Sequence, residues 1–392
     1  MRKMNLKDRY IFMTLSWIFC VAVGSLPYIL SGTLSNSIDA FFECASGLTT
    51  TGASMIQDFG SVPKWVLVYR AFTPWIGGAL FLYTILEDRD LEKPALRFYG
   101  LFTFVEFAVF KIMGLSFFDS LTLALTTIST GGFSCYADNV NHFSMAVRIV
   151  ICIFMTIGGL SYFLLIRTLR NEQSIVKSYF KDEETRFYFL VIIIATVLIA
   201  TVNGFYTNTT FGHTLFNSWF TVTSIISTTG YAATDYTLWP TFSLMLILFL
   251  YFFGGTADSV SGGMKSYRML IAFRMMKRSF SLRIHKYRVY NVSLNGLEIP
   301  ADQVIKTLNY IFTFLACFVA GMILISLGGQ DFQGAFSLAA SSISNTGPSL
   351  ETAALTDFSK IICTLLMILG RIGFYPVFVL FSRYFWNPNK TN

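Results

Sequence analysis

The segment Leu48-Thr49-Thr50-Thr51-Gly52-Ala53 has three counterparts further along the chain. They are Thr127-Ile128-Ser129-Thr130-Gly131-Gly132, Ile226-Ser227-Thr228-Thr229-Gly230-Tyr231 and Ile343-Ser344-Asn345-Thr346-Gly347-Pro348. Each copy is rich in hydroxyl groups and contains Thr-Gly, and the intervals between copies leave room for two helices and a connecting loop. This spacing predicts a chain built from four related units.

A short stretch with a common beginning precedes each Thr-Gly segment. The stretches begin at Ser37, Phe117, Phe211 and Gln330. Each contains only about ten to fourteen residues, whereas a helix needs about 20 residues to cross a bilayer. Asp39, Asp119 and Asp331 suit helix N-termini, where a carboxylate satisfies free N–H groups and interacts favourably with the helix dipole. Each unit is therefore predicted to run spanning helix, half-length re-entrant helix, Thr-Gly strand, spanning helix.

The composition indicates a membrane protein. Of the 392 residues, 54% are hydrophobic and only 13% are charged, and the mean hydropathy is +0.58, whereas soluble domains carry about 25% charged residues. Long apolar runs cover residues 10–30, 65–86, 98–118, 145–166, 187–205, 242–253, 308–327 and 361–385. Most of these runs approach the length of a spanning helix. The first run is too long for a signal peptide and no small-residue cleavage site follows it, so we expect a retained helix.

The net charge of +7 is concentrated between pairs of apolar runs. Basic residues cluster at Arg2–Arg9, Arg167–Arg186 and Lys265–Arg288. By the positive-inside rule these segments are cytoplasmic, which places both termini in the cytoplasm. Lys265 and the basic residues from Arg268 to Arg288 are predicted to meet anionic lipid or a cytoplasmic partner. The distribution favours a membrane protein over a nucleic-acid-binding protein.

These patterns predict an all-α polytopic membrane protein with eight spanning segments and four re-entrant half-helices. The repeats are residues 1–90, 91–175, 176–290 and 291–392. Irregular backbone at membrane depth is tolerated only where protein buries it or where it lines water, so the four strands should converge on one axis. Their carbonyls would replace the water shell of a cation passing along that pore. The alternative is that small polar residues merely mark helix contacts.

The sixth apolar run is interrupted by the glycine-rich loop Gly254–Lys265. A polar interruption at this depth should line an aqueous cavity, with Gly254, Gly255, Gly262 and Gly263 as hinges and Thr256, Ser259 and Ser261 offering hydroxyls to an ion. The alternative is a kinked helix.

Arg371 lies in the middle of the last run, where its insertion costs about 3 kcal/mol. We interpret Arg371 as a fixed positive charge just below the selectivity filter that the four Thr-Gly strands would form. There it would lower cation occupancy or pair with the glycine-rich loop, in which Asp258 is a candidate partner. The alternative is a snorkelling or structurally paired arginine.

Other polar residues in the apolar runs are interpreted as structural. Glu106 and Lys111 lie five positions apart, so separate partners on neighbouring helices are expected. Glu43 either stabilises the first Thr-Gly segment by hydrogen bonding or makes a contact between helices. The six cysteines and His142, His213 and His285 show no metal-ligand spacing, and no ligand role is predicted for them. No Ser/His or Asp/Asp arrangement and no HExxH motif indicates an enzyme.

Together with Trp75-Ile76-Gly77-Gly78, Gly254–Lys265 and Gly370-Arg371-Ile372-Gly373, the four segments resemble those of the Trk/Ktr/HKT superfamily of potassium transporters. The TrkH-like branch looks nearest. TrkH-like proteins generally have two further N-terminal helices, whereas here the first repeat starts almost at Met1, as in KtrB-like proteins. Asp258 is also unusual in a loop that normally contains glycine, serine and small neutral residues.

The resemblance implies a homodimer with one pore per protomer, assembled on a cytoplasmic ring of nucleotide-binding RCK subunits. It implies a filter marked by Gly52, Gly131, Gly230 and Gly347, with K⁺ held by carbonyls of Thr51, Thr130, Thr229 and Thr346. The predicted filter is Thr50, Thr51, Gly52, Ser129, Thr130, Gly131, Thr228, Thr229, Gly230, Asn345, Thr346 and Gly347. The predicted gate, an obstruction below the filter, contains Gly254, Gly255, Thr256, Asp258, Ser259, Gly262 and Gly263.

The function expected from this resemblance is channel-like potassium uptake across the bacterial cytoplasmic membrane. Sodium-preferring plant relatives often have serine at the first filter glycine, so Gly52 favours potassium. No covalently bound cofactor is expected, and nucleotide would act only through the partner subunit. The alternatives are a sodium or mixed-cation transporter of the same superfamily and a non-conducting membrane scaffold.

Overall fold

The computed structural model describes residues 6–85, 89–206, 210–284, 291–350 and 354–381. Its first helices are α1 (Leu6–Leu30), α2 (Ser37–Leu48) and α3 (Lys64–Ile85). They are followed by α4 (Arg89–Ile112), α5 (Phe117–Ile128), α6 (Met145–Gly158) and α7 (Tyr162–Arg170). Next come α8 (Ile175–Lys181), α9 (Glu183–Tyr206), α10 (Phe211–Ile226), α11 (Thr241–Leu250) and α12 (Ser266–Ile284). The last are α13 (Ala301–Leu327), α14 (Phe332–Ser344), α15 (Asp357–Ile372) and α16 (Phe374–Phe381).

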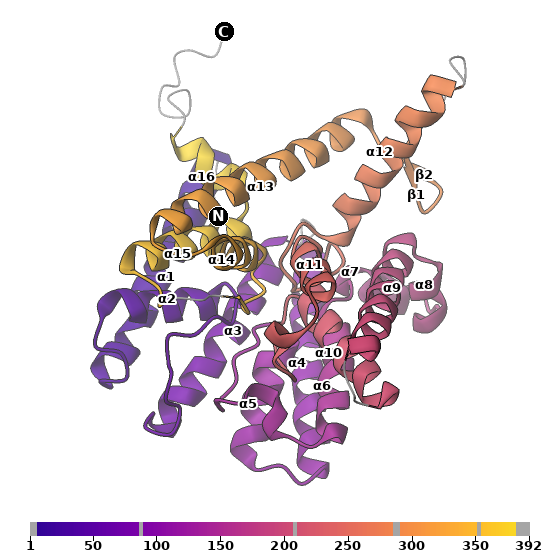
Figure 1. Cartoon of the computed structure of the whole chain (residues 1–392). Helices are drawn as coiled ribbons and strands as arrows, with labels where there is room; N and C mark the ends of the chain where they lie inside the picture. Colours follow the sequence, from indigo (N-terminus) through magenta and orange to yellow (C-terminus); the bar gives the residue numbers. More distant parts are fainter. Residues whose placement is uncertain (1–5, 86–88, 207–209, 285–290, 351–353, 382–392) are drawn as a thin grey trace.

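The fold is mostly helical, but the prediction of an all-α chain was wrong in one detail. Strands β1 (Ser293–Leu294) and β2 (Leu297–Glu298) pair as an antiparallel hairpin between α12 and α13. Asn295 and Gly296 form its turn with φ of 51° and 78°, the left-handed values that a tight hairpin turn requires. Figure 1 shows α12 and this hairpin projecting from the rest of the molecule.

One arrangement recurs four times: a short helix lies between two other helices of the same unit. The short helices are α2, α5, α10 and α14, with 12, 12, 16 and 13 residues. Helix α2 packs against α1 and α3, α5 against α4 and α6, α10 against α9 and α11, and α14 against α13 and α15. In addition, α3 contacts α5, α6 contacts α10, and α15 contacts α2, so the last unit returns to the first (Figure 1).

The expected acidic residues lie at the beginnings of three short helices. Asp331 caps α14, and its carboxylate accepts a hydrogen bond from the Gly334 N–H at 2.8 Å. In α2 and α5 the caps are Asn36 and Ser116, while Asp39 and Asp119 lie within the first turn. Both positions are favourable for a carboxylate at a helix N-terminus.

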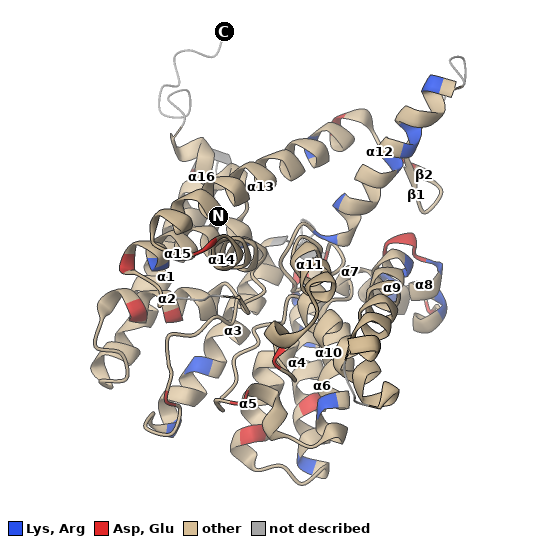
Figure 2. Ribbon diagram, viewed as in Figure 1, with Lys and Arg blue, Asp and Glu red and all other residues tan. Residues whose placement is uncertain are grey.

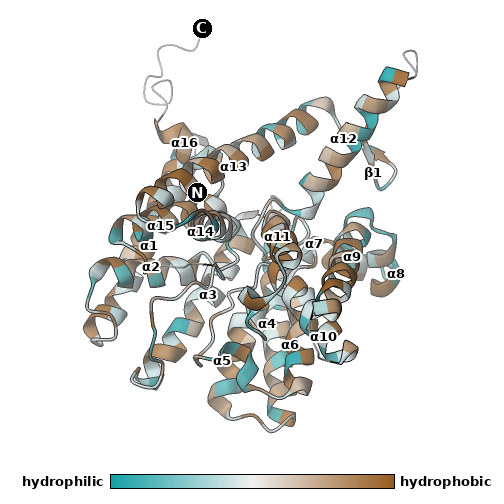
Figure 3. Ribbon diagram, in the orientation of Figure 1, coloured by the Kyte–Doolittle hydropathy of each residue, from teal (hydrophilic) through white to brown (hydrophobic). Residues whose placement is uncertain are grey.

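By length and apolar composition, four described helices could cross a membrane: 10–30, 64–84, 183–206 and 301–327. The number rises to six if the bent pairs α6–α7 and α15–α16 each count as one span. The other two predicted runs end early, because α4 stops at Ile112 and carries Glu106 and Lys111, while α11 has only ten residues. Figure 3 shows apolar residues along α9 and α13, and Figure 2 shows charged residues concentrated on α8 and α12.

Two runs that were predicted to be continuous are interrupted at glycines, and a third is interrupted where a break was predicted. The axes of α6 and α7 differ by 77° across Gly159–Ser161, and those of α15 and α16 differ by 113° at Gly373. The third interruption is the predicted break at Gly254, after which helix resumes at Ser266. Gly77 and Gly370 instead permit close packing, since an added Cβ would lie 1.8 Å from Leu48 O and 2.0 Å from Ile343 O. These two contacts fix the C-terminal ends of α2 and α14.

Candidate functional site

The Thr-Gly segments follow directly on the C-termini of the four short helices. In each, one residue has a positive φ of 52° to 58°, and a glycine two positions later has a positive φ of 62° to 99°. The first residues are Thr50, Thr130, Thr228 and Asn345, and the glycines are Gly52, Gly132, Gly230 and Gly347. Because L side chains rarely adopt such angles, the alternation describes one shared and unusual backbone.

The helix-end hydrogen bonds show the same equivalence. In each segment an N–H donates to the carbonyl five residues earlier, a bond that closes the end of the short helix. The pairs are Thr51 N to Ser46 O, Gly131 N to Thr126 O, Thr229 N to Ser224 O, and Thr346 N to Ser341 O. Thr51, Gly131, Thr229 and Thr346 are therefore structurally equivalent.

This equivalence shifts the second segment by one residue relative to the sequence motif. An alignment of the Thr-Gly pairs makes Gly131 the equivalent of Gly52, Gly230 and Gly347. The φ angles and helix-end hydrogen bonds instead make Gly132 the equivalent of these three glycines. The reason is that α5 ends at Ile128 and Thr130 takes the left-handed position directly after its C-cap, so the structural motif is Thr130-Gly131-Gly132. Sequence alone could not choose between the two adjacent glycines.

The four segments close into a ring. An added Cβ on Gly52 would lie 2.5 Å from Gly131 O, and one on Gly132 would lie 1.7 Å from Thr229 O. An added Cβ on Gly230 would lie 1.9 Å from Thr346 O, and one on Gly347 would lie 2.2 Å from Thr51 O. Each glycine thus touches the carbonyl of the next segment in chain order, and the fourth touches the first. The structure brings together every predicted filter segment.

The ring is surrounded by protein and dense in oxygen atoms, and among its glycines Gly52 and Gly230 are partly exposed. The threonines and Asn345 that form it have 0% exposed surface. Asn345 Nδ2 donates to Thr51 Oγ1 at 3.1 Å and to Met367 O at 2.9 Å, which ties the fourth segment to the first and to α15. Ser227 and Thr229 share a hydrogen bond of 2.8 Å between their hydroxyls. Backbone carbonyls and hydroxyls are the ligands that hard monovalent and divalent cations prefer.

An ion pair behind the ring was not predicted as a pair. Glu43 of α2 and Arg70 of α3 are almost completely buried, and Arg70 Nε donates to Glu43 Oε1 at 2.6 Å. Glu43 also accepts from Met55 N at 2.7 Å and from the Ser54 hydroxyl at 3.1 Å. The expected contact between helices is therefore present, and the same carboxylate accepts hydrogen bonds from the two residues directly after the first segment rather than from the segment itself.

The arginine of this pair reaches the second segment. Arg70 Nη1 donates to Ser134 O at 2.6 Å, and its guanidinium lies 3.7 Å from the centre of the Phe133 ring, next to Gly132. The ion pair therefore connects the chain after segment one with the chain after segment two. The available sequence signal was an arginine in the apolar run 65–86 and a glutamate in the preceding short helix of the same unit, but their pairing required the fold.

The gate loop Gly254–Lys265 packs against the ring rather than forming a kinked helix. Gly262 N donates to Thr228 Oγ1 at 2.7 Å, and Gly263 N donates to Ser344 O at 2.9 Å. Thr256 N donates to Gly159 O at 2.9 Å, at the bend between α6 and α7. The loop therefore contacts segment three, the end of α14 and the second unit at once.

The prediction that Lys265 meets lipid or a cytoplasmic partner was wrong. Its side chain is only 4% exposed and lies inside the protein. Its ammonium group donates to Ser259 O at 3.1 Å and to the carbonyl and hydroxyl of Ser261. It also lies 5.4 Å from the Phe81 ring centre. Lys265 holds the loop in a closed turn, so the hydroxyls of Ser259 and Ser261, predicted to face an ion, are used within the loop.

Arg371 contacts the gate loop through a backbone carbonyl. It is 2% exposed, and its Nη1 donates to Val260 O at 2.8 Å, while the guanidinium lies 3.9 Å from the Phe81 ring centre. The predicted pairing with the loop is present, although the acceptor is Val260 O. Asp258 uses its own carbonyl to accept from Tyr162 N at 3.2 Å. Two buried cations, Arg371 and Lys265, therefore lie beside one ring, that of Phe81.

The observed contacts of Lys111 and Glu106 differ from the predicted ones. Lys111 Nζ donates to Leu115 O in the turn after its own helix, at 2.9 Å, so a partner on a neighbouring helix was wrong. Glu106 is completely buried, and neither carboxyl oxygen has a hydrogen-bond partner among the described residues.

His285 lies outside the described residues; within them no three His, Cys, Asp or Glu side chains gather as a metal site.

Comparison with known proteins agrees with this architecture. A family model described as TrkH, cation transport protein, matches residues 1–86 and 98–387. The Trk system potassium uptake protein TrkG of Escherichia coli (strain K12) is 28% identical over 98% of this chain and 86% of that protein. The Trk system potassium uptake protein TrkH of Vibrio parahaemolyticus serotype O3:K6 is 28% identical over 97% and 86%.

A solved structure is similar over almost the same extent. It is the crystal structure of the potassium transporter TrkH from Vibrio parahaemolyticus, with a TM-score of 0.93 and 27% identity, covering 98% of this chain and 87% of that one. The sequence and structural matches thus cover both the Thr-Gly segments and the glycine-rich loop. Because the family model spans nearly the whole sequence, the chain belongs to the TrkH family of cation transport proteins.

Proposed function

We propose that this multi-pass membrane protein takes up potassium through a pore lined by the four Thr-Gly segments. The ring of equivalent, buried segments is the observation that carries the proposal. Backbone that is neither helix nor sheet is tolerated at membrane depth where it is surrounded by protein or lines water, which suits an ion pathway. Relatives named as potassium uptake proteins support potassium as the ion.

Dehydration of the ion would be offset by segment carbonyls. In the register of the backbone, these carbonyls belong to Thr51, Gly131, Thr229 and Thr346, with Thr130 as the alternative to Gly131 in the second segment. The helices α2, α5, α10 and α14 end at the ring, so the negative ends of four helix dipoles would favour a cation there. No chemical step on a substrate is required.

In this proposal the gate loop and Arg371 control passage below the filter. The loop hydrogen-bonds to Thr228 and Ser344, and Arg371 holds Val260, so an ion leaving the ring would meet a packed loop and a fixed positive charge. Movement of the loop would then open the path. The driving force for uptake would be the membrane potential, worth about 2.3 kcal/mol per charge for each 100 mV.

Replacing Arg371 by glutamine is expected to raise rubidium influx about 30-fold in cells. Repulsion of roughly 2 kcal/mol, the order expected between two unit charges several ångströms apart at an effective dielectric constant of about 20, corresponds to this factor, and the variant also loses the bond to Val260 O. Arg371→Lys retains the charge and serves as the matched control, for which influx close to wild type is expected. Equal influx in all three proteins, at equal membrane abundance, would contradict the role given to the charge.

The proposed membrane arrangement has eight spanning segments and four re-entrant helices. The bent elements α6–α7 and α15–α16 would each act as one span, α11 with the chain that follows it as far as the beginning of α12 would be another, and α4 would supply the remaining one. Both termini and the basic segments would lie in the cytoplasm, in line with the positive-inside rule. A homodimer in contact with lipid, regulated by a cytoplasmic nucleotide-binding RCK ring, completes the proposal.

The test is ion influx into cells that lack potassium uptake, with and without a co-expressed RCK partner. Wild type is expected to admit rubidium in preference to sodium, and Gly52→Ser is expected to weaken that preference, since the new Cβ would lie 2.5 Å from Gly131 O. Equal entry of both ions into both proteins would favour a mixed-cation pore. No influx at verified surface expression, even with the partner, would favour the scaffold alternative.

A further inference from the structure

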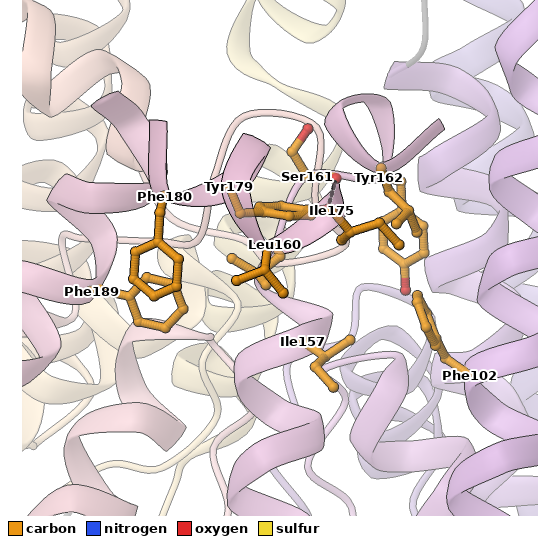
Figure 4. Close-up of a pocket in the computed structure, with 11 residues that line it drawn as sticks. Phe102, Ile157, Leu160, Ser161, Tyr162, Ile175, Tyr179, Phe180 and Phe189 are labelled. Carbon is orange, nitrogen blue, oxygen red and sulfur yellow. Dashed lines mark hydrogen bonds between the residues drawn. The ribbon is translucent and has the colours of Figure 1, made fainter. Parts of the chain in front are cut away.

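An apolar groove lies behind the gate loop, on the far side of the α6–α7 bend. Its volume is about 270 Å³, and it is bounded by α4, α6, α7, α8 and α9 (Figure 4). Phe102, Ile157, Leu165, Val176 and Phe189 line it from these five helices. The volume is close to the lower end of the range for ligand sites, roughly 300 Å³. An open apolar groove of this size in a membrane protein requires an apolar occupant.

The floor of the groove is the backbone that anchors the gate loop. Leu160, Ser161 and Tyr162 line the groove. On the opposite side, Gly159 O accepts hydrogen bonds from Thr256 N at 2.9 Å and from Thr256 Oγ1 at 3.1 Å, and Tyr162 N donates to Asp258 O at 3.2 Å. An occupant of the groove would therefore brace the wall against which the gate loop packs.

The outer wall is the short helix α8, which presents apolar and basic residues together. Val176 and Phe180 are 66% and 67% exposed, although both also line the groove. The hydroxyl of Tyr179, a residue of α8, donates a hydrogen bond to Ser161 O at 2.6 Å. This bond holds α8 over the bend between α6 and α7. A helix with exposed apolar residues and lysines is typical of a membrane interface.

The rim of the groove is positively charged. Arg167, at the end of α7, and Lys177 and Lys181, on α8, are exposed and lie close in sequence to the lining residues Leu165, Val176 and Phe180. Nearby acidic residues are largely engaged elsewhere: Asp182 accepts from Thr185 and Asn295, and Glu183 pairs with Arg274 at 2.8 Å. Glu172 is the exposed acidic residue on the same rim. The charge complements an anionic headgroup at the level of the interface.

We propose that this groove binds one acyl chain of an anionic phospholipid, with its headgroup on Arg167, Lys177 and Lys181. The apolar side chains from five helices provide the chain site, and the basic rim selects the headgroup charge. Bound lipid packs against Leu160–Ser161 and thereby stabilises the gate loop in its packed position. The site requires only that the chain lies in a membrane; its test does not depend on ion conduction.

Native mass spectrometry of the intact purified protein, titrated with dioleoyl phosphatidylglycerol or phosphatidylcholine, tests the headgroup assignment. Phosphatidylglycerol is expected to bind more tightly, and Lys177→Gln/Lys181→Gln should weaken its tightest binding about 20-fold at low ionic strength. Lys277→Gln/Arg283→Gln removes two exposed charges from α12 and is expected to leave that binding unchanged. Equal affinities for the two lipids, or equal loss in both variants, would overturn the proposal.

A second variant tests the acyl-chain site without changing charge. Val176→Trp adds a ring at the groove wall and is expected to remove one tightly bound phosphatidylglycerol, whereas Val105→Trp, at an exposed apolar position on α4, should not. Retention of that lipid by Val176→Trp would contradict the site. Val176→Cys provides the remaining check, because a disulfide between two protomers would show that a second copy covers the groove instead of lipid.

Hydrogen exchange tests the connection to the gate loop. Adding phosphatidylglycerol is expected to slow exchange of peptides covering residues 158–163 and 254–262 in wild type at least threefold, but not in Lys177→Gln/Lys181→Gln. This readout follows the loop contacts of Gly159 and Tyr162 directly. Protection confined to α8, with no change at the loop, would overturn the bracing role.

Discussion

Replacing Gly230 by alanine is expected to reduce the preference for rubidium over sodium about 100-fold. Gly230 has a φ of 81°, and an added Cβ would lie 1.9 Å from Thr346 O, a carbonyl of the neighbouring segment. Alanine must therefore adopt a disfavoured backbone conformation and push the adjoining carbonyl away. Displacement of one carbonyl group alters the cage that replaces the hydration shell, and about 2.7 kcal/mol of lost discrimination corresponds to a factor of 100.

The matched control is Gly212→Ala on the preceding short helix, α10. Apart from its chain neighbours and the backbone of its own helix, no heavy atom lies within 4 Å of a Cβ at Gly212, and alanine is a better helix former than glycine, so selectivity and stability should be retained. Rubidium and sodium influx are measured in parallel, together with the amount of each protein in the membrane. A folded Gly230→Ala protein with wild-type selectivity would rule out the ring as the filter.

Separating Glu43 from Arg70 is expected to give the largest loss of stability. Both side chains are at most 2% exposed, so Arg70→Met leaves a buried carboxylate without its counter-ion and Glu43→Gln leaves a buried guanidinium. Breaking a buried pair in this way costs about 3–5 kcal/mol, because the remaining charge is desolvated without compensation. Thermal unfolding of the detergent-solubilised proteins should show both single variants melting well below wild type.

The double variant Glu43→Gln/Arg70→Met distinguishes charge pairing from simple loss of packing. Since it leaves no unpaired ion, it should be more stable than Arg70→Met alone. Asp302→Asn serves as the control, because Asp302 pairs with Lys306 in an exposed i,i+4 contact, for which less than about 1 kcal/mol is expected. A double variant no more stable than Arg70→Met would show that the remaining charge is not the cause.

Some sequence predictions were limited by local alternatives. The Thr-Gly motif located all four ring segments, yet Gly131 and Gly132 are adjacent, and the choice between them depended on where α5 ends. Lys265 resembled the first residue of a basic cytoplasmic stretch, but the loop folds back and its ammonium group is satisfied by Ser259 and Ser261. The first choice depends on the length of a helix and the second on a loop that folds back on itself within six residues, and a sequence pattern shows neither.

By itself the sequence determined the membrane character, the fourfold repeat, the short helices before each Thr-Gly segment and the break at Gly254. These features follow from hydropathy, segment length and glycine placement, which are local properties of the chain. Only the tertiary structure decided the order of contact around the ring, the Glu43–Arg70 link, and the attachment of the gate loop to Thr228, Ser344 and Arg371. Those contacts join residues that are distant in the sequence, several of them in different repeats, and their geometry exists only once the helices pack and exclude water from the buried charges.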